Sequence, residues 1–239
     1  MVRLQATLRD DTAISAPAAQ LKAVALRLFA ERGVDGVTVR EIATASGQKN
    51  HAAVGYYFGS KEQLVRELVK DGAVEMDRRR NVRLDEMEAK GGPQDVRDIV
   101  DVLVFPAVEV ENVVPNYNRF VVLLSMTHRE LMMDALENRW NSGYQRCLNH
   151  LRTLMPNMPR VLQNQRFVFM GAYLGNVLAR REQALSDHSR AHPVWGAGYS
   201  LEHFAHSLTA LLEAPFDPGV AVLAPAAAAN EQLSDGPIG

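Results

Sequence analysis

The segment Thr38–Gln63, TVREIATASGQKNHAAVGYYFGSKEQ, constrains the fold most, because it contains helix starts and a helix stop within a few turns of chain. Thr38 followed three residues later by Glu41 is a capping-box pattern, in which each side chain accepts a hydrogen bond from the other residue's backbone N–H. A helix is therefore predicted to begin at Val39. Gly47 tolerates the positive φ that ends a helix, so this first helix is short.

A second short helix is predicted over His51–Tyr57, after a turn at Gly47–Asn50. Ser60 with Gln63 repeats the capping pattern, so a further helix is expected from Lys61 onward. Two short helices joined by a glycine turn and followed by a separately capped helix are the parts of a DNA-reading helix-turn-helix.

An apolar helix is predicted upstream of this segment. Leu21, Ala25, Leu28 and Phe29 recur at helical spacing, and Gly33 supplies the stop. Three helices before residue 58 can therefore share one small core.

Several residue types recur across this region at spacings that point to one family: Phe29, Gly33, Thr38, Ile42, Ala43, Gly47, the run Tyr56-Tyr57-Phe58, and Ser60-Lys61-Glu62. They resemble the DNA-binding domain of TetR-family transcriptional regulators over 21–68. Two departures stand out. The turn segment Gln48–His51 carries one residue more than the family's usual turn, and Tyr57 stands where the family often has a histidine.

The resemblance implies an all-α protein with an N-terminal three-helix domain and a larger helical ligand-binding and dimerisation domain. We expect a loose arm at 1–16, the helix-turn-helix domain at 17–60, the larger domain at 61–214, and an unstructured Ala-, Pro- and Gly-rich tail at 215–239. A chain of 239 residues with 47% hydrophobic content is long enough for two cores.

Helical patterns continue through the larger domain, and no strand alternation is evident. Lys61–Glu88 is predicted to be one long charged helix, and Pro106 is predicted to kink or interrupt the next one. Asn116 and Ser200 are candidate N-caps of later helices. Pro159 begins a long apolar segment that runs to residue 181.

The charge distribution favours DNA at the N-terminal end. The net charge is -2, yet residues 1–61 hold eight basic and five acidic side chains, so this part carries +3 and the remainder -5. The run Arg78–Arg80 is interpreted as a solvated helix face, and the alternative is that it supports DNA binding through long-range charge. The single cysteine, Cys147, suits a reducing cytoplasm, and no segment suggests a signal peptide or a membrane span, so we expect a cytoplasmic protein.

The candidate DNA contacts divide into residues that position the protein and residues that read bases. The expected phosphate contacts are Thr38, Tyr56, Tyr57 and Lys61. The expected base contacts are Gln48, Lys49, Asn50, His51, Ala52 and Ala53, because Gln and Asn suit adenine, Lys suits guanine and Ala suits a thymine methyl group. The alternative for each of these residues is a solvated turn side chain.

Soft and aromatic side chains in the larger domain indicate a cavity for a bulky apolar effector. The candidates are Phe120, Met126, Trp140, Tyr144, Phe169, Met170 and Tyr173. The alternative is that this stripe is ordinary core.

The resemblance also implies a homodimer, formed by the last two long helices near Arg160–Arg181 and Ser200–Glu213. Gly171, Ala172 and Gly175 would allow a partner helix to approach closely. The alternative is a central helix buried within one subunit.

Three functions follow from these features. The first is a repressor that leaves a palindromic double-stranded operator when a small hydrophobic effector binds, as is common in the family. The second is a DNA-binding dimer whose larger domain binds a protein partner or no effector. The third is a helical enzyme using His128, Cys147 and His150. No cofactor is expected, and no metal either, because the pairs Cys147/His150 and His203/His206 lack the ligands of a usual site.

Overall fold

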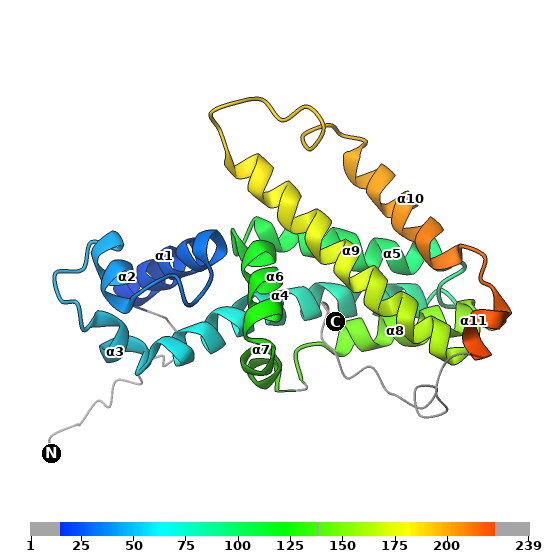
Figure 1. Cartoon of the computed structure of the whole chain (residues 1–239), viewed down its shortest axis with the longest axis horizontal. Coiled ribbons are helices and arrows are strands. Elements are labelled where there is room, and N and C mark those ends of the chain that lie inside the picture. The colour runs from blue at the N-terminus through cyan, green and yellow to red at the C-terminus, as the bar shows by residue number, and fades with distance from the viewer. Residues whose placement is uncertain (1–14, 138, 223–239) are drawn as a thin grey trace, which may run out of the picture.

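The computed structural model describes residues 15–137 and 139–222, and every regular element within these ranges is a helix. The all-α prediction is therefore confirmed for the described residues. Figure 1 shows a small head at one end of an elongated molecule, joined by one long helix to a larger helical domain. The helices are α1 (Ala16–Arg32), α2 (Val39–Ala45), α3 (Ala53–Phe58), α4 (Lys61–Glu88), α5 (Val96–Glu111), α6 (Tyr117–Thr127), α7 (Arg129–Leu136), α8 (Ser142–Leu154), α9 (Arg160–Ser186), α10 (Ser200–Glu213) and α11 (Pro218–Val222).

The predicted arm and tail lie mostly outside the described residues. Within the segment 215–239, for which no structure was expected, the described part contains the short helix α11.

The ends of the head helices are set by capping residues and by glycines with positive φ. Thr38 Oγ1 accepts from the Glu41 N–H at 3.2 Å, and Glu41 Oε2 accepts from the Thr38 N–H at 2.8 Å, so the predicted capping box is present. Gly47 has φ 73°, which brings the Gln48 N–H to the Ala43 carbonyl oxygen at 2.9 Å and closes α2. A shared core of Leu21, Phe29, Ile42, Val54, Phe58 and Leu64 holds α1 to α4 together.

Helix α4 connects the two domains. Its first half buries Leu64 and Leu68, and its second half buries Met76 and Leu84 against α5, α7 and α8. The predicted bounds of this helix are confirmed at both ends.

Helix α6 makes a second connection between the domains, since it lies against α1 on one side and α9 on the other (Figure 1). The rings of Phe29 and Phe120 stack with centroids 6.2 Å apart, and Arg119 Nη2 donates to the Ala30 carbonyl at 3.3 Å. At the other end of α6, His128 Nε2 lies 3.1 Å from Asp35 Oδ2 in the head.

Several local predictions need correction. Of the two outcomes predicted for Pro106, a kink or an interruption, the interruption is wrong, because α5 continues through this residue. Asn116 occupies the N-cap position of α6 with a left-handed backbone and no capping side-chain bond, and Tyr199, not Ser200, is the N-cap of α10. Arg80, expected on a solvated helix face, is buried at 3% exposure.

Candidate nucleic-acid interface

The turn before α3 is longer than predicted, and the side chain of Asn50 explains why. Asn50 Oδ1 accepts from the Ala52 N–H at 2.9 Å, and the Asn50 carbonyl accepts from the Ala53 N–H at 3.1 Å. These bonds form a local turn that competes with helix over residues 50–52. Helix α3 therefore begins at Ala53, two residues later than predicted, and is six residues long.

The turn presents most of the predicted base-reading residues to solvent. Lys49, Asn50, His51 and Ala52 are exposed, and Gln48 is half-buried. Ala53 is the exception, since it is buried at 4% exposure within the head core and cannot meet a base edge.

The exposed surface of α3 contains one position that the sequence did not single out. Gly55 is exposed, and a Cβ added there would meet no atom within 4 Å. Tyr56 beside it is 81% exposed, and its ring meets the half-buried Tyr57 edge-on with centroids 4.9 Å apart. This surface is therefore a small, open backbone face with one protruding aromatic ring.

Two of the predicted phosphate contacts already have partners within the protein. The Thr38 hydroxyl both accepts from the Glu41 N–H and donates to Glu41 Oε2 at 2.8 Å. Hydrogen bonds from the Thr38 N–H and hydroxyl, followed by that from Arg32, lower the pKa of Glu41 to about 2, so this carboxylate stays charged. Lys61 Nζ donates to the carbonyl oxygens of Val34 at 3.0 Å and Val37 at 3.1 Å, which anchors the loop between α1 and α2 to the start of α4.

Most other cations of the head are paired with carboxylates. Lys22 bridges Glu67 and Asp71 of α4, Arg27 pairs with Glu31, and Arg32 pairs with Glu41. Within residues 15–60, two exposed cations have no carboxylate partner, namely Arg40 and Lys49. Arg40 was not among the predicted DNA contacts. Its sequence context held a signal, because no acidic residue lies three or four positions from Arg40 on its helix.

The comparisons with known proteins agree with this geometry. The sequence model for bacterial regulatory proteins of the tetR family matches residues 21–68, which form α1 to the first turns of α4. Residues 21–68 are a TetR-family DNA-binding domain, and the resemblance described above is confirmed over these residues.

Solved structures support the same fold over most of the chain. Mycobacterium smegmatis AmtR is 17% identical with a TM-score of 0.53, and the match covers 92% of this chain and 95% of that one. SCO3833 from Streptomyces coelicolor A3, described as a member of the TetR transcriptional regulator family, is 17% identical with a TM-score of 0.50, covering 88% and 98%. No curated protein sequence matches this chain.

The seven predicted effector contacts differ in their burial. Phe120, Tyr144 and Met170 are buried, and Trp140 is half-buried. Met126 is 77% exposed, while Phe169 at 52% and Tyr173 at 37% point outward from α9. The sequence could not separate these groups, because an apolar stripe at helical spacing is the same for core, pocket and interface.

The larger domain nevertheless holds a small interior cavity of about 40 Å³ between α4, α5, α6 and α9. Its walls include Met76, Tyr117, Val121, Leu174 and Leu178, together with the buried Arg80. The volume is enough for a few water molecules. Two larger hollows, of about 510 and 610 Å³, lie at the surface and are lined largely by charged and polar side chains.

The outward face of α9 and α10 is partly apolar. Val168, Phe169, Ala172 and Tyr173 are exposed along α9, and the Tyr173 ring meets Phe204 of α10 edge-on at 5.4 Å. Gly171 and Gly175 are buried on the opposite side, so of the three small residues only Ala172 faces outward.

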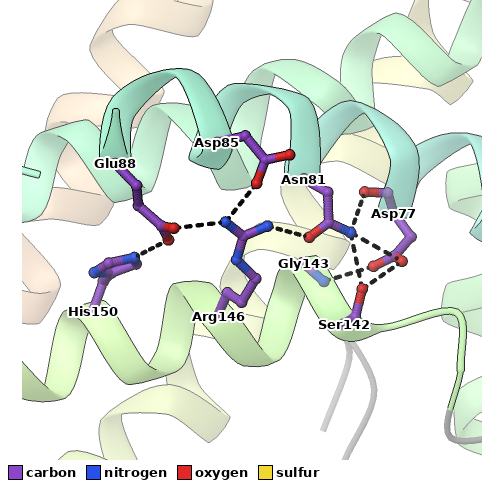
Figure 2. Close-up of polar contacts among 8 residues, drawn as sticks. All are labelled: Asp77, Asn81, Asp85, Glu88, Ser142, Gly143, Arg146 and His150. Carbon is purple, nitrogen blue, oxygen red and sulfur yellow. Dashed lines mark hydrogen bonds and ion pairs between the residues drawn. The ribbon is translucent and has the colours of Figure 1, made fainter. Parts of the chain in front are cut away.

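A polar seam joins α4 to α8 (Figure 2). Arg146 donates to Asn81 Oδ1 at 2.6 Å, Asp85 Oδ1 at 2.7 Å and Glu88 Oε2 at 2.9 Å, and His150 Nε2 lies 2.8 Å from Glu88 Oε1. The hydrogen bond from His150, followed by that from Arg146, lowers the pKa of Glu88. This seam holds the long α4 in register with α8.

The residues of the enzyme alternative serve structural roles. His128 pairs with Asp35 of the head and His150 with Glu88, while Cys147 is fully buried. Burial raises the pKa of the Cys147 thiol to about 12, so the reactive thiolate is strongly disfavoured.

Within the described residues, no helix is long and apolar enough to cross a membrane, and no cluster of three or more metal-ligating side chains occurs.

Proposed function

We propose that this protein is a homodimeric repressor that binds a palindromic operator through α3 and the preceding turn, and that leaves it when a small effector binds in the larger domain. The DNA-binding head corresponds to 17–60, and the effector-binding and dimerisation domain to 61–214. The observation that carries the proposal is the exposed turn and α3 surface, flanked by the free cations Arg40 and Lys49.

The side chains divide the DNA contacts as follows. Arg40, Lys49 and Tyr56 contact phosphates, because they are exposed and a cation or phenol donates readily to a phosphate oxygen. Gln48, His51 and Ala52 face the bases, and Gly55 allows the backbone of α3 to approach the groove closely.

Dimerisation through α9 and α10 places two heads on one duplex. The apolar outward face that contains Phe169, Ala172 and Tyr173 supports this arrangement, since an exposed apolar patch on a helix pair favours a partner of the same kind. A twofold dimer matches a palindromic site.

Effector control requires that the two domains move relative to one another. Helix α4 carries any change in the larger domain to α3, and the α1–α6 contact through Phe29 and Phe120 provides a second path. An effector shifts the equilibrium only if it prefers one arrangement of these helices.

A second candidate function is a DNA-binding dimer without an effector. The interior cavity of about 40 Å³ favours it, because a bulky apolar effector needs several times that volume.

The direct test is an electrophoretic mobility shift of the full chain on DNA that covers its own promoter and other genomic fragments, at fixed salt with competitor DNA. The double variant Arg40→Ala/Lys49→Ala should lose the shift, while Lys90→Ala, which removes an exposed cation in the turn after α4, should retain it. If the double variant Arg40→Ala/Lys49→Ala retains the specific shift, as Lys90→Ala does, the assignment of this DNA-binding surface is overturned. A shift that no small molecule releases would favour the second candidate.

A further inference from the structure

The buried Arg80 in the middle of α4 is a cation that forms no salt bridge within the described residues, although the charge of Asp77, three residues earlier, acts on it. It is 3% exposed, and its Nε has no hydrogen-bond partner among the described residues. Its neighbour across the interior is Tyr144, whose ring centroid lies 5.6 Å from the guanidinium carbon. Burial lowers the pKa of Arg80, yet an arginine remains charged in proteins. An isolated buried cation is costly, so its retention here calls for a compensating group.

The nearest carboxylate on the same helix is fully engaged elsewhere. Asp77 accepts from the Gly143 N–H at 2.7 Å, from the Ser142 hydroxyl at 2.7 Å and from Asn81 Nδ2 at 3.1 Å (Figure 2). These bonds cap the N-terminus of α8. None of the hydrogen bonds of the Asp77 carboxylate comes from Arg80, so the two side chains do not form a salt bridge.

Arg80 instead borders two adjacent interior hollows, and among the described residues it is the only charged one that lines either of them. One is the cavity of about 40 Å³, and the other, of about 10 Å³, lies toward α7 and is lined also by Val69, Met132 and Trp140. Trp140 Nε1 is a second buried donor without a partner among the described residues. Both orphaned groups donate, and the surrounding walls are mostly apolar, with the amide of Asn118 and the ring of Tyr117 as the polar exceptions.

We infer that these hollows form a binding site for a short-chain monocarboxylate, whose carboxylate pairs with Arg80 and whose apolar body lies against Val121, Leu174 and Leu178. A guanidinium binds a carboxylate through two parallel N–H···O bonds, so a small acid supplies both the charge and the acceptors that the site lacks. The cavity of about 40 Å³ accommodates the acid head group, and a longer apolar body requires the walls to move.

The site deepens the proposed function by giving the effector a chemical class, and only its effect on DNA rests on that function. Arg80 lies on α4, the helix that joins the larger domain to α3. A carboxylate that draws Arg80 away from Tyr144 would act directly on this connection.

The test is calorimetric and thermal-shift titration of the full chain with sodium butyrate at pH 7 and constant ionic strength, with butyramide as the uncharged analogue. Butyrate should bind saturably and raise the melting temperature, and butyramide should do neither. Arg80→Met should bind butyrate at least tenfold more weakly, and it should fold because it removes a buried charge that has no ion-pair partner. Arg78→Met, which removes an exposed cation two residues away, should bind like the parent chain.

Several results would overturn the inference: equal binding of butyrate and butyramide, unchanged binding in Arg80→Met, or no binding of acetate, butyrate or benzoate. A separate titration with chloride tests whether the site is specific for carboxylates. Saturable binding of chloride in the absence of any carboxylate would overturn the assignment of a carboxylate ligand. If Arg80→Met does not fold, Trp140→Phe keeps the inference testable, because loss of the second donor should also weaken binding. These assays contain no DNA, so a failure of operator binding would count against the proposed function and not against this site.

Discussion

At the scale of single residues, the cations of the head differ in whether they already form hydrogen bonds within the protein or remain available to bind DNA. Lys61 donates to two backbone carbonyls, whereas Arg40 is exposed with no such contact. Each phosphate contact that is lost reduces the slope of log affinity against log salt by about 0.9. Arg40→Met should therefore flatten the salt dependence by about one contact and leave the stability of the head unchanged.

Lys61→Met should instead lower the free energy of unfolding by about 2 kcal/mol, because the carbonyls of Val34 and Val37 lose a charged donor. Urea unfolding and salt-dependent binding measured on both variants separate the two roles, with Lys90→Met as the control. An unchanged stability of Lys61→Met together with a reduced salt slope would return this lysine to the phosphate contacts.

Glu182 is a buried carboxyl group whose titration should be visible in stability. Burial raises its pKa to about 7, although its Oε2 accepts from the Arg119 N–H at 2.9 Å, and nearby Glu111 raises it further. The folded state thus holds a proton between about pH 4.5 and 7 that the unfolded chain has released. Stability should fall as pH rises through this range, by about 3 kcal/mol in total.

Glu182→Gln keeps an acceptor for the Arg119 N–H but cannot titrate, so its stability should be flatter between pH 5 and pH 8 than that of the parent chain. Urea unfolding at three pH values measures the difference, and the exposed Glu86→Gln serves as the matched control. Parallel pH profiles for parent and Glu182→Gln would show that this carboxyl group titrates normally.

At the scale of helices, the sequence predicted elements where a local chemical rule decides the boundary. The capping residues Thr38 and Ser60 and the left-handed Gly47 placed the ends of α2 and the start of α4 correctly. The start of α3 was missed because the Asn50 side chain forms a turn that competes with the helix.

Burial of single positions was less predictable than helix boundaries. Ala53 and Arg80 are buried for tertiary reasons, since the head core covers the first and the α4–α8 contact covers the second. A sequence pattern contains neither neighbour, and an arginine in a charged run is usually solvated. The sequence located the exposed turn before α3, but it could not tell which side chains of this region are exposed.

The contact between α4 and α6 depends on a glycine, Gly72, which has no side chain to collide with the Tyr117 ring. A Cβ at Gly72 would lie 2.2 Å from the Tyr117 ring, and the Tyr117 hydroxyl donates to the Val69 carbonyl at 3.0 Å. Gly72→Ala should therefore destabilise the protein by about 1 to 3 kcal/mol despite the better helix propensity of alanine. Gly55→Ala is the control, because open space surrounds that position and the same change should be neutral or stabilising. Thermal unfolding of both variants decides, and equal melting temperatures would mean that Tyr117 moves aside without cost.

At the scale of the whole molecule, the exposed apolar residues divide by the surface on which they lie. Phe169 and Tyr173 were predicted as effector contacts, but they lie on the outward face of α9 beside α10. A hydrophobic stripe in the sequence does not tell whether its partner is in the same subunit or in a second one. Their exposure in the single chain favours a subunit contact, and in the proposed dimer this contact would set the distance between the two heads.

Phe169→Glu should separate the subunits, because it places a charge in the middle of that apolar face. Size-exclusion chromatography with light scattering should then show a monomer, while the helical content stays unchanged. Binding to a palindromic site should weaken by on the order of a hundredfold, since two linked heads gain affinity from effective concentration, whereas binding to an isolated half-site should not change. Val113→Glu, an equally exposed apolar position after α5, should remain a dimer. A Phe169→Glu chain that stays dimeric and binds the palindrome normally would place the subunit contact on another face, and the two heads would then be joined through a different pair of helices.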